Sequence, residues 1–140
     1  MYYLLTIIFL SVLLSGCSTT MEHQAKTTVI TDAATTIVAL NGGAVELNPI
    51  ITPTPTGIVA ISLVKWALVE HVAQSDLEDR DDYLRIMTGV WGGASINNLL
   101  VILGASNPIS ILAGIIGGYL LFKQPASDEP VDKETDLVYN

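Results

Sequence analysis

The chain has 140 residues, of which 50% are hydrophobic and 14% charged, and its mean hydropathy is +0.51. An ordinary soluble domain carries about 25% charged residues, so this composition favours a membrane protein. The formal net charge of −8 argues against a nucleic-acid binder, and a single cysteine excludes an internal disulfide and a multi-cysteine zinc site.

The first segment ends in a motif for lipoprotein processing. Residues 1–15 are apolar but fall short of the ~20 residues of a comfortable transmembrane helix, as is typical of a signal peptide. Leu14-Ser15-Gly16-Cys17 looks like a bacterial lipobox, although no Lys or Arg precedes the apolar run. We therefore expect a signal peptide at 1–16, a diacylglycerol on Cys17, and a lipidated polar tether at 17–26. The alternative is an uncleaved first helix.

The next segment, Thr27–Leu47, contains Asp32 and Glu46. A charged residue at the centre of a membrane helix costs about 2.5–3.5 kcal/mol on insertion scales, so this helix would need to enter the bilayer as a hairpin with the next one. The alternative is an interfacial helix outside the bilayer, which would leave three membrane spans and a lipid anchor.

The rest of the chain alternates between apolar runs and polar connections. The apolar runs are Gly57–Val72, Leu84–Leu103 and Pro108–Phe122, and the polar segments are a Pro-rich turn at 48–56, an acidic loop at 73–83 and a disordered acidic tail at 123–140. The apolar runs show neither a stripe of charge nor the alternation of a β-barrel strand. The sequence thus predicts an all-α fold, a small helical membrane bundle at 27–122 with three or four transmembrane helices. Four crossings would place the acidic loop and the tail outside with Cys17, whereas three would put them on opposite faces.

Lys65 lies near the middle of its predicted span, too deep to reach either surface. Ionisable groups inside a membrane indicate function by default, and a buried ammonium needs an acidic partner. Asp32 and Glu46 are the two candidates on the preceding helix, and the sequence does not choose between them. The resulting ion pair would fix the hairpin, or would line a path for protons or cations.

Small residues recur every four positions in the last two apolar runs. They are Gly89, Gly93 and Asn97 in the first run, and Ser110, Gly114 and Gly118 in the second. This spacing forms a groove through which two helix backbones approach closely, within one chain or in a homo-oligomer. Asn97 or Asn98 would add a hydrogen bond across such a contact.

The segment 31–72 resembles an uncharacterised family of small multi-pass membrane proteins. The residues that carry the resemblance are Asp32, Thr35-Thr36, Gly43, Glu46-Leu47-Asn48-Pro49 and Lys65. The family pattern is an Asp- and Thr-rich helix that ends in Glu-x-Asn-Pro, followed by a lysine-bearing helix. The resemblance implies a membrane fold and supplies no activity, and the lipobox and the Thr-Pro repeat of this chain depart from the pattern.

The sequence contains no catalytic motif and no metal-ligand spacing. We therefore expect a non-enzymatic integral protein of the plasma membrane, lipid-anchored on the outer face, with a structural or interaction role in the cell envelope. Its expected partners are the bilayer and either another copy or an envelope protein, with no cofactor beyond the fatty acyl groups on Cys17. The alternative is a small oligomeric channel, transporter or phage holin-like permeabilising protein.

Overall fold

The computed structural model describes residues 20–46 and 52–124, and these form four α-helices with no strand. The helices are α2 (Met21–Asn41), α3 (Pro55–Ala73), α4 (Arg80–Ile102) and α5 (Asn107–Phe122). The predicted all-α bundle is thus confirmed. The signal peptide, the lipidation site Cys17 and the acidic tail lie outside the described residues.

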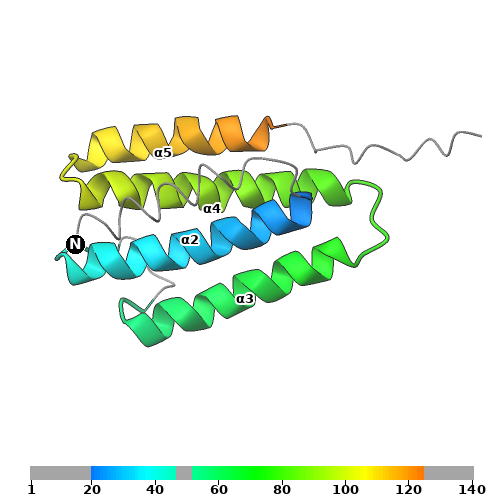
Figure 1. Ribbon diagram of the computed structural model, residues 1–140, viewed down its shortest axis with the longest axis horizontal. Helices are drawn as coiled ribbons and strands as arrows, with labels where there is room; N and C mark the ends of the chain where they lie inside the picture. The colour runs from blue at the N-terminus through cyan, green and yellow to red at the C-terminus, as the bar shows by residue number, and fades with distance from the viewer. Residues whose placement is uncertain (1–19, 47–51, 125–140) are drawn as a thin grey trace, which may run out of the picture.

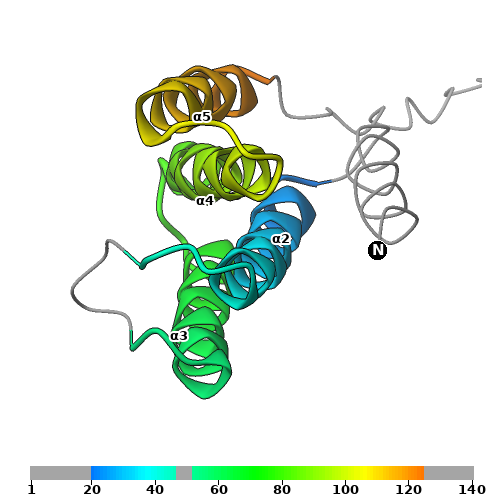
Figure 2. The ribbon, with the colours of Figure 1, turned by 90° about the vertical axis from the view of Figure 1, so that its left-hand side faces the viewer.

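The four helices lie in a row rather than in a closed bundle. Consecutive helices run antiparallel (Figure 1), and α4 lies between α5 and α2, with α3 at the other edge (Figure 2). Among the described helices α5 contacts only α4, whereas α3 packs on α2 and to a lesser extent on α4. Each edge helix therefore leaves one side uncovered by the other described helices.

Helix α2 occupies a different stretch from the predicted Thr27–Leu47. It begins at Met21, because the Thr20 hydroxyl accepts a hydrogen bond from the His23 N–H at 3.3 Å and caps the helix. It ends at Asn41, where Gly43 adopts a φ of +91° and stops the helix. Residues 21–26, expected in the polar tether, are therefore helical, and Glu46 lies beyond the helix end.

The other helices agree with the predicted segments more closely. Thr54 caps α3 with Pro55 in its first turn, two residues before the expected start. Helix α4 begins at Arg80, so the connection between α3 and α4 is only 74–79, shorter than the acidic loop expected at 73–83. Helix α5 follows the expected Pro108–Phe122 with one added residue at its start.

The hydrophobic core lies at the end of the row where α2 begins and α3 ends. Its buried residues come from α2, α3 and α4, and they are Met21, Ala25, Val29, Val69, Val72 and Leu84. Met21 and Ala25 are buried in this core, and their packing stabilises the first turns of α2. The 74–79 connection and the end of α5 lie at this same end, and the α4–α5 turn lies at the opposite end (Figure 1).

One described helix, α3, is long and apolar enough to cross a membrane, and only 17% of its apolar window is buried within the protein. Helix α5 is also apolar but has 16 residues. A single such helix is weak support for a multi-pass membrane protein, so the membrane placement remains a proposal.

Candidate functional site

An ion pair joins the middles of the two helices of the first hairpin. The Lys65 Nζ lies 2.5 Å from the Asp32 Oδ2, and the two side chains are 18% and 9% exposed. Of the two predicted partners of Lys65, the structure brings Asp32 to it. Because α2 ends at Asn41, Glu46 lies past the helix rather than on it.

Helix α4 contributes an amide to the same site. The Asn98 Nδ2 donates a hydrogen bond to the Thr36 Oγ1 at 2.8 Å and lies 3.5 Å from both the Asp32 Oδ1 and the Thr35 Oγ1. We call Asp32, Thr35, Thr36, Lys65 and Asn98 the polar cluster. It ties α2 to both α3 and α4, with the charged groups mostly shielded from solvent.

An aromatic ring completes the surroundings of Lys65. The Nζ lies 5.8 Å from the centre of the Trp91 ring on α4, within the range of a cation–π interaction. The ammonium is thus held by a carboxylate on one helix and a ring on another. Its charge is balanced by contacts within the chain, as a charge in a low-dielectric interior requires.

Lys26 forms a second ionic group toward the end of the row where α2 begins. Its Nζ lies 2.5 Å from the Glu22 Oε1 and also pairs with Glu70 of α3, and it lies 5.3 Å from the centre of the Trp66 ring. Lys26 was expected in the polar tether, and this ionic group was not predicted, although the four-residue spacing from Glu22 to Lys26 is a helical signal.

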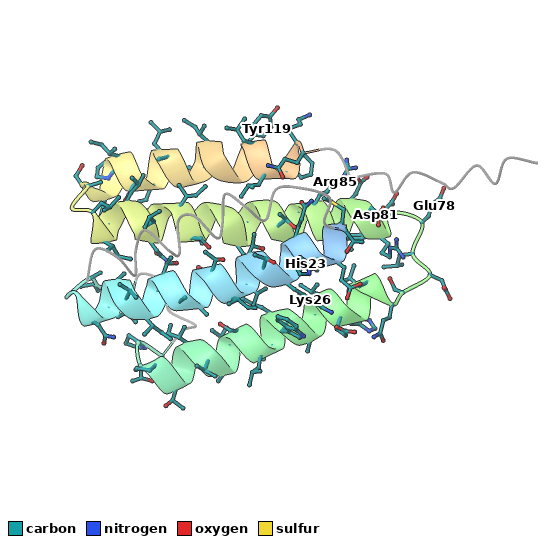
Figure 3. The ribbon with its side chains drawn as sticks, in the orientation of Figure 1. His23, Lys26, Glu78, Asp81, Arg85 and Tyr119 are labelled. Atoms are coloured by element: carbon teal, nitrogen blue, oxygen red, sulfur yellow. The ribbon has the colours of Figure 1, made fainter. Side chains whose placement is uncertain are left out.

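Other charged side chains gather at that same end. Figure 3 shows Asp81 and Arg85 near the start of α4, Glu78 on the connection before it, and Lys26 close by on α2. Among the described residues, charge is therefore concentrated at one end of the row, apart from the polar cluster and Glu46.

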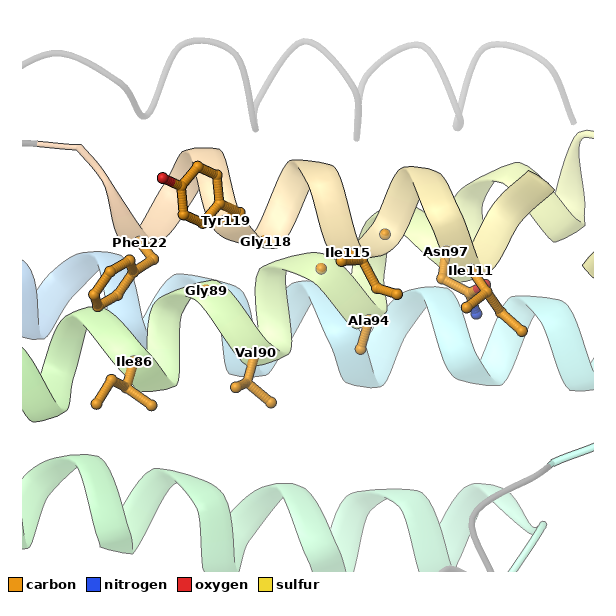
Figure 4. Close-up of a pocket in the computed structure, with 12 residues that line it drawn as sticks. Ile86, Gly89, Val90, Ala94, Asn97, Ile111, Ile115, Gly118, Tyr119 and Phe122 are labelled. Carbon is orange, nitrogen blue, oxygen red and sulfur yellow. The ribbon is translucent and has the colours of Figure 1, made fainter. Parts of the chain in front are cut away.

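The small residues predicted to mediate helix packing lie in the contact between α4 and α5 (Figure 4). A Cβ added to Gly93 would lie 2.6 Å from the Gly114 carbonyl oxygen, and one added to Gly118 would lie 2.5 Å from the Gly89 carbonyl oxygen. Neither distance is accessible to a real side chain, so the two backbones touch through the glycines. Of the two predicted alternatives, the structure contains the contact within one chain.

Asn97 belongs to this glycine stripe and faces α5. A Cβ added to Gly114 would lie 3.0 Å from the Asn97 Cβ. The Asn97 Nδ2 donates to the neighbouring Asn98 at 3.4 Å, and its Oδ1 is buried without a hydrogen-bond partner among the described residues. The hydrogen bond predicted across the glycine contact is not found there among the described residues, because Asn98 bonds to Thr36 of α2 instead.

The described residues contain no group of three or more His, Cys, Asp or Glu side chains that could hold a metal ion. The polar cluster pairs one acid with one base and surrounds them with amide and hydroxyl groups. It can hold helices in register, bind water, or exchange a proton.

Comparison of the chain with protein-family models, curated proteins and solved structures finds no match. The function is therefore inferred from the chemistry and placement of the residues described above.

Proposed function

We propose that this chain is a non-enzymatic integral protein of the plasma membrane, lipid-anchored through Cys17, with a structural or interaction role in the cell envelope. The observation that carries the proposal is the distribution of polarity. The charged pair lies inside the row of helices, and large apolar side chains lie outside.

The outward apolar side chains cover both edge helices. Those at least half exposed on α3 are Val59, Leu63 and Val64, and those on α5 are Ile109, Leu112, Ile115, Ile116, Tyr119 and Leu120. Monomeric soluble proteins rarely expose a contiguous apolar patch beyond a few hundred Å². Such a surface is stable against lipid chains, which need no hydrogen bonds from the protein.

The helix lengths agree with this placement. At about 1.5 Å per residue, the 19 residues of α3 extend for about 28 Å, close to the ~30 Å hydrocarbon core of a bilayer. The 16 residues of α5 extend for about 24 Å, a mismatch that a bilayer accommodates by thinning locally.

The arrangement of the helix ends supports four crossings over three. The start of α2, the 74–79 connection and the end of α5 lie at one end of the row (Figure 1). Cys17 is three residues before Thr20, so at ~3.5 Å per residue its lipid would anchor within about 11 Å of that end. In the proposed orientation this acidic end faces outward, and the α4–α5 turn faces the cytoplasm.

The polar cluster gives the protein its structural role in this proposal. An ion pair between α2 and α3 and an amide bridge to α4 hold three helices in one register. The uncovered sides of α3 and α5 are then left to contact lipid, another copy or an envelope protein.

The test separates the helices from the lipid anchor. Residues 1–16 are replaced by a cleavable leader without a lipobox, and Cys17→Ala removes the acylation site. The proposal expects this chain to stay in the membrane pellet after extraction with alkaline carbonate, whereas a soluble periplasmic protein behind the same leader is released. Release of the variant would overturn the integral placement.

A second candidate is the small oligomeric channel or holin-like protein, which the open row of helices favours. Edge helices that leave a side uncovered can pair between copies and enclose a pore. Expression in bacteria would then cause ion leakage or lysis, which the structural role does not predict.

A further inference from the structure

A polar cavity of about 260 Å³ opens at the end of the row opposite the acidic connection. It lies between the end of α2, the last turns of α4 and the start of α5. Its polar lining consists of Thr36, Glu46, Asn97, Asn98 and Asn107, and we call it the polar vestibule.

The vestibule has the size and chemistry to hold water. A water molecule takes about 30 Å³ in the liquid and needs two to four polar partners, so a space of this volume lined by amides and a hydroxyl holds several. The Asn97 Oδ1 is buried too deeply to touch this water, which would contact the other polar groups of the lining.

The vestibule reaches the ion pair through two shared residues. Thr36 and Asn98 line the vestibule and also belong to the polar cluster. The Asn98 Nδ2 lies 3.5 Å from the Asp32 Oδ1, and the other carboxylate oxygen of Asp32 pairs with Lys65. The inner end of the vestibule is thus one side chain away from the charges at the middle of α2 and α3.

The charge of the lining favours cations. Among the described residues, Glu46 is the one charged side chain that lines the vestibule. The Asp32–Lys65 pair beyond it is neutral overall.

We infer that the polar vestibule is filled with water and admits small monovalent cations from one end of the protein as far as Asn98. Water at this depth hydrates the polar cluster and lets protons exchange with the Asp32–Lys65 pair from one side. The inference extends the proposed function, since it gives the bundle a one-sided aqueous path to its charged centre.

Cysteine labelling tests the inference. Ala39 lines the vestibule, whereas Ser95 on α4 is similarly buried and does not line it. Ala39→Cys and Ser95→Cys are made in the full chain and treated with small charged methanethiosulfonates in detergent and in sealed vesicles. Ala44→Cys, which lies nearer the vestibule mouth, serves if Ala39→Cys does not fold, and the unsubstituted chain gives the background.

Only a thiolate in contact with water reacts quickly, so we expect the cationic reagent to modify Ala39→Cys at least about tenfold faster than Ser95→Cys. A unit charge ~6 Å away in water favours a monovalent cation over an anion by about tenfold. After each rate is divided by the rate of the same reagent with a free thiol, the cationic reagent should therefore modify Ala39→Cys about tenfold faster than the anionic reagent does. Glu46→Gln should reduce this ratio of rates toward one.

Each result decides one part of the inference. Equal rates at Ala39→Cys and Ser95→Cys in detergent would overturn the water-filled vestibule, and equal rates for the two reagents at Ala39→Cys would overturn its preference for cations. Labelling from both faces of sealed vesicles, with the rate difference retained, would overturn the membrane placement and leave the vestibule standing.

Discussion

The ion pair between Lys65 and Asp32 leads to a prediction that a double-mutant cycle can test. Lys65→Met removes the ammonium from a position where it is only 18% exposed and leaves the Asp32 carboxylate, 9% exposed, without its partner. Asp32→Asn does the reverse and keeps a side chain that can still bond to Asn98. The double variant has no buried charge to compensate.

The magnitude follows from the burial of the two groups. Breaking a buried ion pair costs about 3–5 kcal/mol when the remaining charge stays uncompensated. The Asp32 carboxylate can take up a proton and keeps its contact with Asn98. We therefore expect Lys65→Met to lower the free energy of unfolding by about 2 kcal/mol, less than that range.

The assay is unfolding in detergent micelles, followed by circular dichroism. The coupling energy between Lys65→Met and Asp32→Asn should be about 1–2 kcal/mol, above the ~0.6 kcal/mol average for hydrogen bonds between membrane helices. Asp81→Asn provides the control, because Asp81 pairs with Arg80 at the start of α4, and its cycle with Lys65→Met should be additive. Additivity in the Asp32 cycle would refute the ion pair as a structural element.

Three further predictions concern the helix contact, the topology and the lipid. Gly93→Ala should lower the free energy of unfolding in micelles by about 1–2 kcal/mol, because its methyl would meet a carbonyl oxygen of α5 at 2.6 Å. Gly117→Ala is the control and should be neutral, because its methyl would meet only the end of a flexible isoleucine. Equal losses of stability in the two variants would contradict the glycine contact. Cysteines at Asp76 and Gln124 should react with an impermeant thiol reagent from the same face of the membrane, and reaction from opposite faces would support three crossings. Cys17→Ala should abolish fatty-acid labelling and cleavage of residues 1–16, and unchanged labelling and gel mobility would disprove the lipoprotein assignment.

Local signals in the sequence were sufficient to locate most of the helices. The Pro108 signal acts within one turn, so the start of α5 was predicted to within one residue, whereas α3 begins two residues earlier than predicted because Pro55, assigned to the turn, lies in its first turn. The start of α2 was missed although Thr20 and the Glu22–Lys26 spacing mark it locally, because this polar stretch was assigned to a tether, and the packing of Met21 against α3 and α4 is not visible in the sequence.

The partner of Lys65 illustrates what only the tertiary structure decided. Asp32 and Glu46 were both compatible with a hairpin, because the depth of each residue depends on where α2 ends and how the two helices align. The early end of α2 at Asn41 leaves Glu46 outside the helix and Asp32 at the level of Lys65.

The rotation of α4 about its axis gives Asn97 and Asn98 different contacts. Four-residue spacing in the sequence placed Asn97 on the stripe with Gly89 and Gly93, and this stripe packs on α5. The next residue points about 100° further round the helix, so Asn98 faces α2 and makes the amide bridge. The sequence by itself determined the helices, the glycine stripe and the need for a partner to Lys65, because these depend on spacing along one chain. Tertiary structure decided which side chains meet, because that depends on the rotation and register of helices whose contacts are far apart in sequence.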